Sequence, residues 1–174
     1  EAGLWYRPSY FPKEGETNWR QSCDREVNMV RSSVGICDVS TLGKIDIQGP
    51  DVAAFLDFVY INTFSTLKPG RVRYGLMLRE DGTVMDDGTT ARLSDTHYVM
   101  TTTTAAAGAV MRHLEYVHQC LRPELDVSMV SVTEQWAQFA VAGPKSRALL
   151  NELLDAPIDN DSFPFMGCGD VAIG

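Results

Sequence analysis

The sequence has no stretch approaching the roughly 18 uncharged apolar residues that a membrane-spanning helix requires. Its first residues, Glu1 to Pro8, show no basic start followed by an apolar run, so no secretory signal is visible. It also lacks Gly-x-Gly-x-x-Gly, a phosphate loop and Gly-x-Ser-x-Gly, which argues against the nucleotide sites and serine hydrolases that these motifs identify. We therefore expect no membrane partner and a site that no short catalytic motif reveals.

Metal-binding patterns are also missing. His113 and His118 are five residues apart, so on one helix they point in different directions, and His97 adds no ligand spacing. No Cys-x-x-Cys pair occurs among the four cysteines, which are Cys23, Cys37, Cys120 and Cys168. This pattern favours reduced thiols in a cytoplasmic protein, with no metal site.

The balance of residue types is that of a folded globular protein. Apolar residues make up 44% and charged residues 22% of the 174 residues, enough for one domain with a real core. The net charge is −8 and is spread along the chain, which favours solubility and offers no general attraction for nucleic acid. We expect no nucleic-acid partner.

Four segments have the apolar spacing of helices. The first covers Asn18 to Ser33 and is expected to end at Gly35. The others start at Gly49-Pro50-Asp51, at the hydroxyl-rich run Thr101–Thr104, which can cap a helix, and at Gly143-Pro144. Each of the last three has a set of apolar residues at helical spacing: Val52, Phe55, Leu56 and Val59; Val110, Leu114, Val117 and Leu121; Leu149, Leu150, Leu153 and Leu154. The last set is expected to be buried.

Strands are expected between these helices. The clearest pair is a hairpin around Asp81-Gly82. The final residues, Asp170 to Gly174, resemble the opening of a further strand. The expected strands cover residues 42–48, 71–79, 83 onward, 97–101, 125–132 and 135–142.

A short internal repeat bears on the fold class. Residues 45–56 and 139–150 both place apolar residues four and two positions before a Gly-Pro pair and six and seven positions after the glycine. The same strand–turn–helix unit is therefore expected twice. Two copies favour an α+β fold with pseudo-symmetric antiparallel sheets and packed helices over a doubly wound nucleotide-binding fold.

Asp86-Asp87 is the one unusual feature of the strands. Aspartate is among the poorest strand formers, and two in a row put one carboxylate on each face of the sheet. A carboxylate on the core face needs partners. The alternative interpretation is an edge strand protected by charge, or a bulge at Gly88.

Tyr74 is expected to face this region from the neighbouring strand. Counting from the hairpin turn, Leu78 pairs near Val84–Met85, and Tyr74 pairs near Gly88–Thr89. A ring beside a carboxylate suits a flat heteroaromatic ligand with N–H groups, although an ordinary cross-strand aromatic is the alternative. The Thr101–Thr104 run is likewise either a strand end with a helix cap or a ligand contact.

Several motifs, taken in order, resemble the folate-binding aminomethyltransferase family over about residues 18–154. They are Arg31-x-x-x-Gly35-x-x-Asp38-x-Ser40, Gly49-Pro50-Asp51, Arg73-Tyr74-Gly75 and Glu80-Asp81-Gly82-x-x-x-Asp86-Asp87. Within that family, further segments resemble the alpha subunits of heterotetrameric sarcosine oxidases. These are Trp5-Tyr6-Arg7-Pro8, Ser40-Thr41-Leu42-Gly43-Lys44 and Glu134-Gln135-Trp136.

The resemblance implies the first part of a three-lobed fold around tetrahydrofolate. Residues 1–17 would be an arm leading from a preceding domain, and residues 18–174 the N-terminal part of the folate-binding domain, truncated at its C-terminal end. Asp86 would be the catalytic residue beside the folate nitrogens, and Tyr74 would lie near the pteridine. Thr101 would be a further folate contact, at a position that is often Asn in the glycine-cleavage branch.

The resemblance also implies a reaction. The whole enzyme would oxidise sarcosine at a flavin, and tetrahydrofolate would capture the one-carbon unit as 5,10-methylenetetrahydrofolate. The flavin (FAD or FMN) and NAD would lie in other parts of a complex with beta, gamma and delta subunits, and the 174 residues alone would be inactive. A stand-alone aminomethyltransferase of the glycine-cleavage type and a non-catalytic folate-fold assembly module remain as alternatives.

Overall fold

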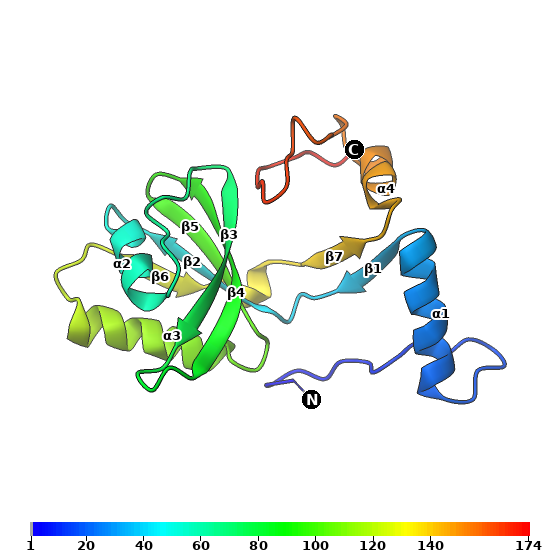
Figure 1. Cartoon of the computed structure of the whole chain (residues 1–174), viewed down its shortest axis with the longest axis horizontal. Helices are drawn as coiled ribbons and strands as arrows, with labels where there is room; N and C mark the ends of the chain where they lie inside the picture. The colour runs from blue at the N-terminus through cyan, green and yellow to red at the C-terminus, as the bar shows by residue number, and fades with distance from the viewer. Residues whose placement is uncertain (1) are drawn as a thin grey trace. The chain divides into compact units, whose positions relative to one another are not determined.

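A computed structural model describes residues 2–174, which form two compact units (Figure 1). Unit 1 comprises residues 2–40, 137–163 and 170–174, and unit 2 comprises residues 41–136 and 164–169. Residues 2–17, expected to be an arm from a preceding domain, are part of unit 1. Both units combine helices with antiparallel strands, so the expected α+β class is confirmed.

Unit 2 is built on a five-stranded antiparallel sheet with the order β3-β4-β5-β2-β6. Its strands are β2 (Gly43–Gln48), β3 (Arg71–Leu78), β4 (Val84–Ser94), β5 (His97–Thr102) and β6 (Ser128–Ser131). The helices of the unit are α2 (Val52–Val59), α3 (Ala107–Tyr116), which continues into the π-helical turn η1 (Val117–Leu121), and the short 3-10 helix η2 (Thr133–Gln135). The strands expected over residues 42–48, 71–79, 83 onward, 97–101 and 125–132 are present, as is a helix after each of Gly49-Pro50-Asp51 and the Thr101–Thr104 run.

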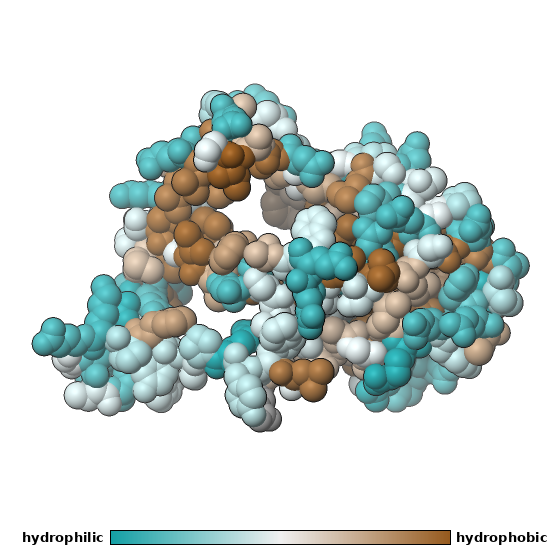
Figure 2. Space-filling model, turned by 180° about the vertical axis from the view of Figure 1, so that it is seen from behind, coloured by the Kyte–Doolittle hydropathy of each residue, from teal (hydrophilic) through white to brown (hydrophobic). Residues whose placement is uncertain are grey.

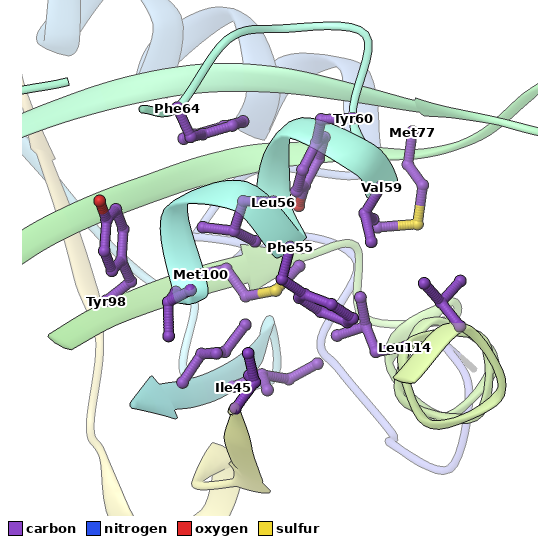
Figure 3. Close-up of a cluster of buried hydrophobic side chains, with 14 of the residues drawn as sticks. Ile45, Phe55, Leu56, Val59, Tyr60, Phe64, Met77, Tyr98, Met100 and Leu114 are labelled. Carbon is purple, nitrogen blue, oxygen red and sulfur yellow. The ribbon is translucent and has the colours of Figure 1, made fainter. Parts of the chain in front are cut away.

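The core of unit 2 lies between its helices and one face of the sheet (Figure 3). Each large apolar side chain removed from water there contributes about 1.5–3 kcal/mol. The apolar stripe of α2 is buried, as are Val110, Leu114 and Val117 of α3 and η1, whereas Leu121 is exposed. The largest fully buried side chains are Tyr98, Phe55, Phe64, Ile45, Ile47, Leu56, Met77, Met100 and Leu114.

Unit 1 contains helix α1 (Trp19–Ser32), the two-stranded ribbon of β1 (Gly35–Asp38) and β7 (Phe139–Ala142), and helix α4 (Ser146–Leu153). The side chain of Asn18 caps α1 by accepting from the backbone N–H of Gln21 at 3.2 Å. The prediction that Gly35 ends this helix is wrong, since Gly35 is the first residue of β1. Glycine is needed because a Cβ there would lie 2.5 Å from the side chain of Val30.

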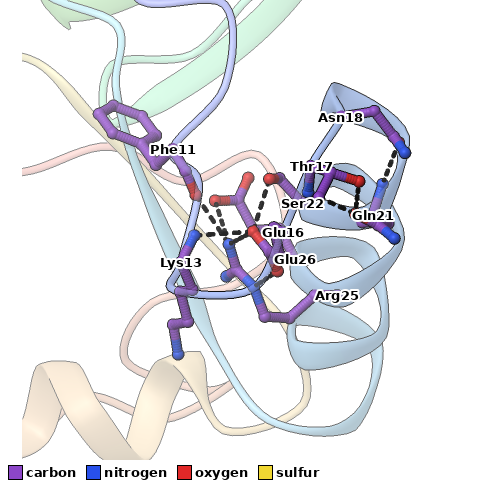
Figure 4. Close-up of polar contacts among 9 residues, drawn as sticks. All are labelled: Phe11, Lys13, Glu16, Thr17, Asn18, Gln21, Ser22, Arg25 and Glu26. Atoms are coloured by element: carbon purple, nitrogen blue, oxygen red, sulfur yellow. Dashed lines mark hydrogen bonds and ion pairs between the residues drawn. The ribbon is translucent and has the colours of Figure 1, made fainter.

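A polar cluster fastens the segment before α1 to the helix (Figure 4). The Glu16 carboxylate accepts from Arg25 Nε at 2.6 Å, from Ser22 Oγ at 2.6 Å and from the backbone N–H of Lys13 at 2.8 Å. Arg25 also donates to the carbonyl of Phe11 at 2.8 Å. The hydrogen bond from Arg25, followed by those from Ser22 and Lys13, lowers the pKa of Glu16 to about 2.

The depressed pKa of Glu16 predicts an acid-sensitive attachment. The carboxylate ordinarily titrates near 4.5, so its stabilising contribution is complete above that pH and disappears as the pH falls towards about 2. The protection factors of the amides of residues 11–22 against hydrogen exchange should therefore fall as the pH is lowered over this interval. In Glu16→Gln the exchange should already be fast at pH 6, whereas Glu14→Gln, which neutralises an exposed neighbour, should behave like the parent. If the parent chain and Glu16→Gln exchange these amides equally fast at every pH, Glu16 does not hold this segment to the helix.

The predicted internal repeat is present, with one copy in each unit. The strand–turn–helix β2–α2 matches β7–α4, and each helix has eight residues. The turn glycines Gly49 and Gly143 have φ of 140° and 118°, where a side chain would be strained. A Cβ at Gly49 would meet the carbonyl of Asp126 at 2.2 Å, and one at Gly143 would meet that of Ser33 at 2.4 Å.

The repeat extends to the strand paired with each copy. Ile45 pairs with Ser131 in β6, and the equivalent Phe139 pairs with Asp38 in β1, with matching registers along both ladders. A helix precedes each partner strand, α1 before β1 and α3 before β6. The duplicated unit is therefore larger than the sequence indicated, because a backbone register leaves little trace in side-chain identity.

The two copies differ in burial. Unlike α2, helix α4 has no buried residue, and Leu153 is 49% exposed. The prediction that Leu149, Leu150, Leu153 and Leu154 are buried is wrong for this chain. Apolar spacing shows only which residues share a face, whereas burial needs an opposing layer. Figure 2 shows apolar side chains gathered over the ribbon and α4 of unit 1.

Two further expectations about element ends are wrong. The Thr101–Thr104 run does not cap a helix, because Thr101 and Thr102 end β5, and α3 starts after Ala106 without a side-chain cap. Residues 170–174 form no strand, but only an isolated bridge between Ile173 and Leu154.

Candidate functional site

The two carboxylates of the Asp-Asp pair lie on opposite faces of β4, as expected from strand alternation. Asp86 pairs across the ladder with Met77, which is in the core, and only 6% of Asp86 is exposed. Asp87 pairs with Leu76 and is partly exposed. The alternative of a bulge at Gly88 is not observed, since the register shift lies on the other side of Asp86, opposite Met77 and Leu78.

Asp86 is held by the turn that follows β5. Its Oδ1 accepts from Thr103 Oγ1 at 2.7 Å, and its Oδ2 accepts from the Thr103 backbone N–H at 3.2 Å. On the same side of the sheet, burial raises the pKa of Tyr60, and the negative charge of Asp86 raises it further. Asp86 is therefore a buried carboxylate with partners from its own unit.

Tyr74 meets the other carboxylate. It pairs with Thr89, and Gly75 pairs with Gly88, so the predicted register is confirmed. Tyr74 is 51% exposed, and its hydroxyl donates a hydrogen bond to Asp87 Oδ2. The structure thus brings Tyr74 together with Asp87, not with Asp86.

Thr101 lies on the same face of the sheet as Tyr74 and Asp87, because its neighbours Met100 and Thr102 are the core-facing residues of β5. Its Oγ1 accepts from the Thr89 backbone N–H at 2.9 Å and donates to the Thr89 carbonyl at 3.1 Å. The single hydroxyl hydrogen is used in this contact. The Thr89 hydroxyl also lies 3.0 Å from Thr101 Oγ1, so the remaining acceptor position of Thr101 is open to a ligand only when Thr89 does not donate to it.

Gly88 is a residue whose role the sequence did not reveal. A Cβ at this position would lie 2.0 Å from the carbonyl oxygen of Thr101, so β4 and β5 approach more closely here than any side chain allows. The available signal was a glycine inside a strand, which commonly marks close backbone approach. Gly88 therefore determines the local path of the chain next to Asp87.

The partly exposed face of the sheet offers a ring, a carboxylate acceptor and hydroxyl groups. This combination can stack a flat ligand and accept hydrogen bonds from its N–H groups. Within residues 2–174, no group of three or more histidine, cysteine or acidic side chains is arranged to hold a metal ion. No helix in the same residues is long and apolar enough to cross a membrane.

The family model of the GCVT N-terminal domain matches residues 1–174. The chain belongs to this family. Among its relatives are proteins named sarcosine oxidase subunit alpha, from Rhizobium meliloti at 54% identity and from a Corynebacterium species at 45%. The alignments cover 99% of the chain but only 18% of each relative. This GCVT-family chain therefore spans less than a fifth of the length of these relatives.

More distant relatives agree on the family. An aminomethyltransferase of Chloroherpeton thalassium is 31% identical over 84% of the chain and 39% of its own length. The crystal structure of glycine cleavage system aminomethyltransferase T from Bartonella henselae superposes with a TM-score of 0.70 at 22% identity. That match covers 77% of this chain and 36% of the other. The GCVT chain thus has the aminomethyltransferase fold, as the motifs predicted.

Proposed function

We propose that this chain is the tetrahydrofolate-binding portion of a sarcosine oxidase, where the one-carbon unit released from sarcosine is captured as 5,10-methylenetetrahydrofolate. The 54% identity to a sarcosine oxidase subunit alpha supports the enzyme, and the GCVT family match supports the folate site. The observation that carries the proposal is the half-exposed Tyr74, whose hydroxyl donates a hydrogen bond to Asp87 on one face of the sheet. A pteridine is flat and carries N–H groups, so it fits both partners.

Three residues, Tyr74, Asp87 and Thr101, would contact the folate. Tyr74 stacks on the pteridine, and its hydroxyl orients the acid beside it. The family resemblance implied Asp86 as the catalytic carboxylate, but Asp87 is the carboxylate on the Tyr74 face, so we assign the ligand contact to Asp87. Its carboxylate would accept a proton from the reacting folate nitrogen, or orient it, which is work typically worth about 10²–10⁴-fold. Thr101 would accept one hydrogen bond from the ligand.

The rest of the reaction is assigned to other parts of the protein. A flavin would oxidise the amine, with NAD also bound outside these residues, in a cytoplasmic complex with beta, gamma and delta subunits. The printed name "subunit alpha" of the relatives supports such a complex, and the small share of their length covered here leaves room for those sites. The chain's own residues bind and orient the acceptor of the one-carbon unit.

The test compares Asp87→Asn with Asp86→Asn in the full-length protein. Losing one charged hydrogen bond costs about 1.5–3 kcal/mol, so Asp87→Asn should weaken tetrahydrofolate binding roughly 10- to 100-fold. Titration calorimetry measures the affinity, and parallel assays of methylenetetrahydrofolate and peroxide separate capture from amine oxidation. Peroxide formation should stay unchanged. The proposal is wrong if the parent protein does not bind tetrahydrofolate, or if Asp87→Asn loses methylenetetrahydrofolate and peroxide formation equally.

A stand-alone aminomethyltransferase is the second candidate, favoured by the 31% identity to the protein of that name. It predicts transfer from an aminomethyl group on a carrier protein, with no peroxide from sarcosine. Sarcosine-dependent peroxide formation by the full-length protein decides between the two. A third possibility, a non-catalytic assembly module, predicts no tetrahydrofolate binding at all.

A further inference from the structure

The backbone pairing between β4 and β5 ends close to Asp87. The backbone ladder between these strands runs from Thr90↔Met100 towards the other end of the sheet. On the Asp87 side of Thr90 the ladder has ended, while β4 stays paired with β3 as far as Val84. The segment Asp86–Thr89 is therefore joined to the β5 end by something other than ladder bonds.

Two side-chain bridges take the place of the ladder. The first links Thr89 to Thr101, whose Oγ1 satisfies both the N–H and the carbonyl of the Thr89 backbone. The second links Asp86 to Thr103 through the threonine hydroxyl and backbone N–H. Asp87 lies between the two bridges in the chain, with its side chain on the opposite face from Asp86.

We propose that Asp86 is a positioning residue, which acts through Thr103 to set where Asp87 stands on the ligand face. The inference rests on the proposed folate function and deepens it, because it divides the Asp-Asp pair into one ligand contact and one anchor. Since β4 is a single stiff strand, a shift of Asp86 moves the backbone of Asp87 with it. Gly88 transmits the constraint, because its hydrogen-only side chain keeps β4 against the Thr101 carbonyl.

The chemistry of the Thr103 turn explains why the anchor is a carboxylate. Thr103 presents two donors, its hydroxyl and its backbone N–H, and a carboxylate can accept both. The amide of an asparagine would offer one acceptor and direct an N–H₂ group at a donor.

The proposal is tested with Asp86→Asn, Thr103→Val, Thr103→Ser and the double variant Asp86→Asn/Thr103→Val in the full-length protein. We expect Asp86→Asn and Thr103→Val each to raise the calorimetric dissociation constant of tetrahydrofolate about tenfold, the size of one lost hydrogen bond to a charged group. Thr103→Ser keeps both donors and should bind like the parent. The double variant should be no weaker than either single one, because both remove the same bridge.

Three outcomes would overturn the inference, and each is distinguishable from failure of the folate function. Unchanged affinity in Asp86→Asn, with weakened binding in Asp87→Asn, would leave folate binding intact and remove the anchor. Additive losses in the double variant would mean that Asp86 contacts the ligand by itself. Parallel losses of peroxide formation and melting temperature would show general damage instead of positioning. Absence of folate binding in the parent would overturn both proposals together.

Discussion

Replacing Leu56 with alanine should lower the free energy of unfolding of unit 2 by about 2–5 kcal/mol, the usual cost of a buried Leu→Ala change. Leu56 is 0% exposed and lies in the stripe of α2 that faces the core. Removing its side chain leaves a cavity among residues that pack at the density of an organic crystal. Urea denaturation of the 174-residue chain, followed by hydrogen exchange of β2 and β5 amides, measures the loss.

The matched control is Leu150→Ala, which changes the equivalent residue of the second copy. Leu150 occupies the same position of α4, one residue after Leu149, as Leu56 does after Phe55 in α2. Because it is only partly buried, its loss should cost roughly 1 kcal/mol or less. Equal costs at the two positions would contradict the difference in burial between the copies.

Gly88→Ala should be the most damaging single-methyl change near the candidate site. The new Cβ would lie 2.0 Å from the carbonyl oxygen of Thr101, and a backbone atom cannot rotate away as a side chain can. Overpacking of this kind costs about 1–3 kcal/mol and sometimes more, and it would force β4 away from β5 beside Asp87. We expect a lower urea midpoint for the chain and, in the full-length protein, loss of tetrahydrofolate binding.

Gly108→Ala provides the opposite control. Gly108 lies in α3, and the nearest atom to a Cβ there would be an Arg112 guanidinium nitrogen at 3.7 Å, an ordinary contact. Alanine should therefore raise stability by about 0.5–1 kcal/mol, because glycine is a poor helix former. If Gly88→Ala proves as harmless as Gly108→Ala, the close approach of the two strands does not exist in solution.

The candidate site was partly predictable. Counting from the hairpin at Asp81-Gly82 placed Tyr74 opposite Gly88 or Thr89, and the structure pairs it with Thr89. Alternation along a strand then required the two aspartates to lie on opposite faces. Which of them shares a face with Tyr74 depends on the register shift opposite Met77 and Leu78, which the count from the hairpin did not include.

The sequence by itself determined the elements that local chemistry controls. These include the Asn18 cap, the two Gly-Pro turns that need positive φ at Gly49 and Gly143, the strands with alternating residues, and the family motifs. Only the tertiary structure decided the features that depend on partners distant in the chain. Those are the burial of α2 but not α4, the attachment of Asp86 to Thr103, and the close approach at Gly88. Periodicity shows which side chains share a face, but an opposing layer or a neighbouring strand determines what that face contacts.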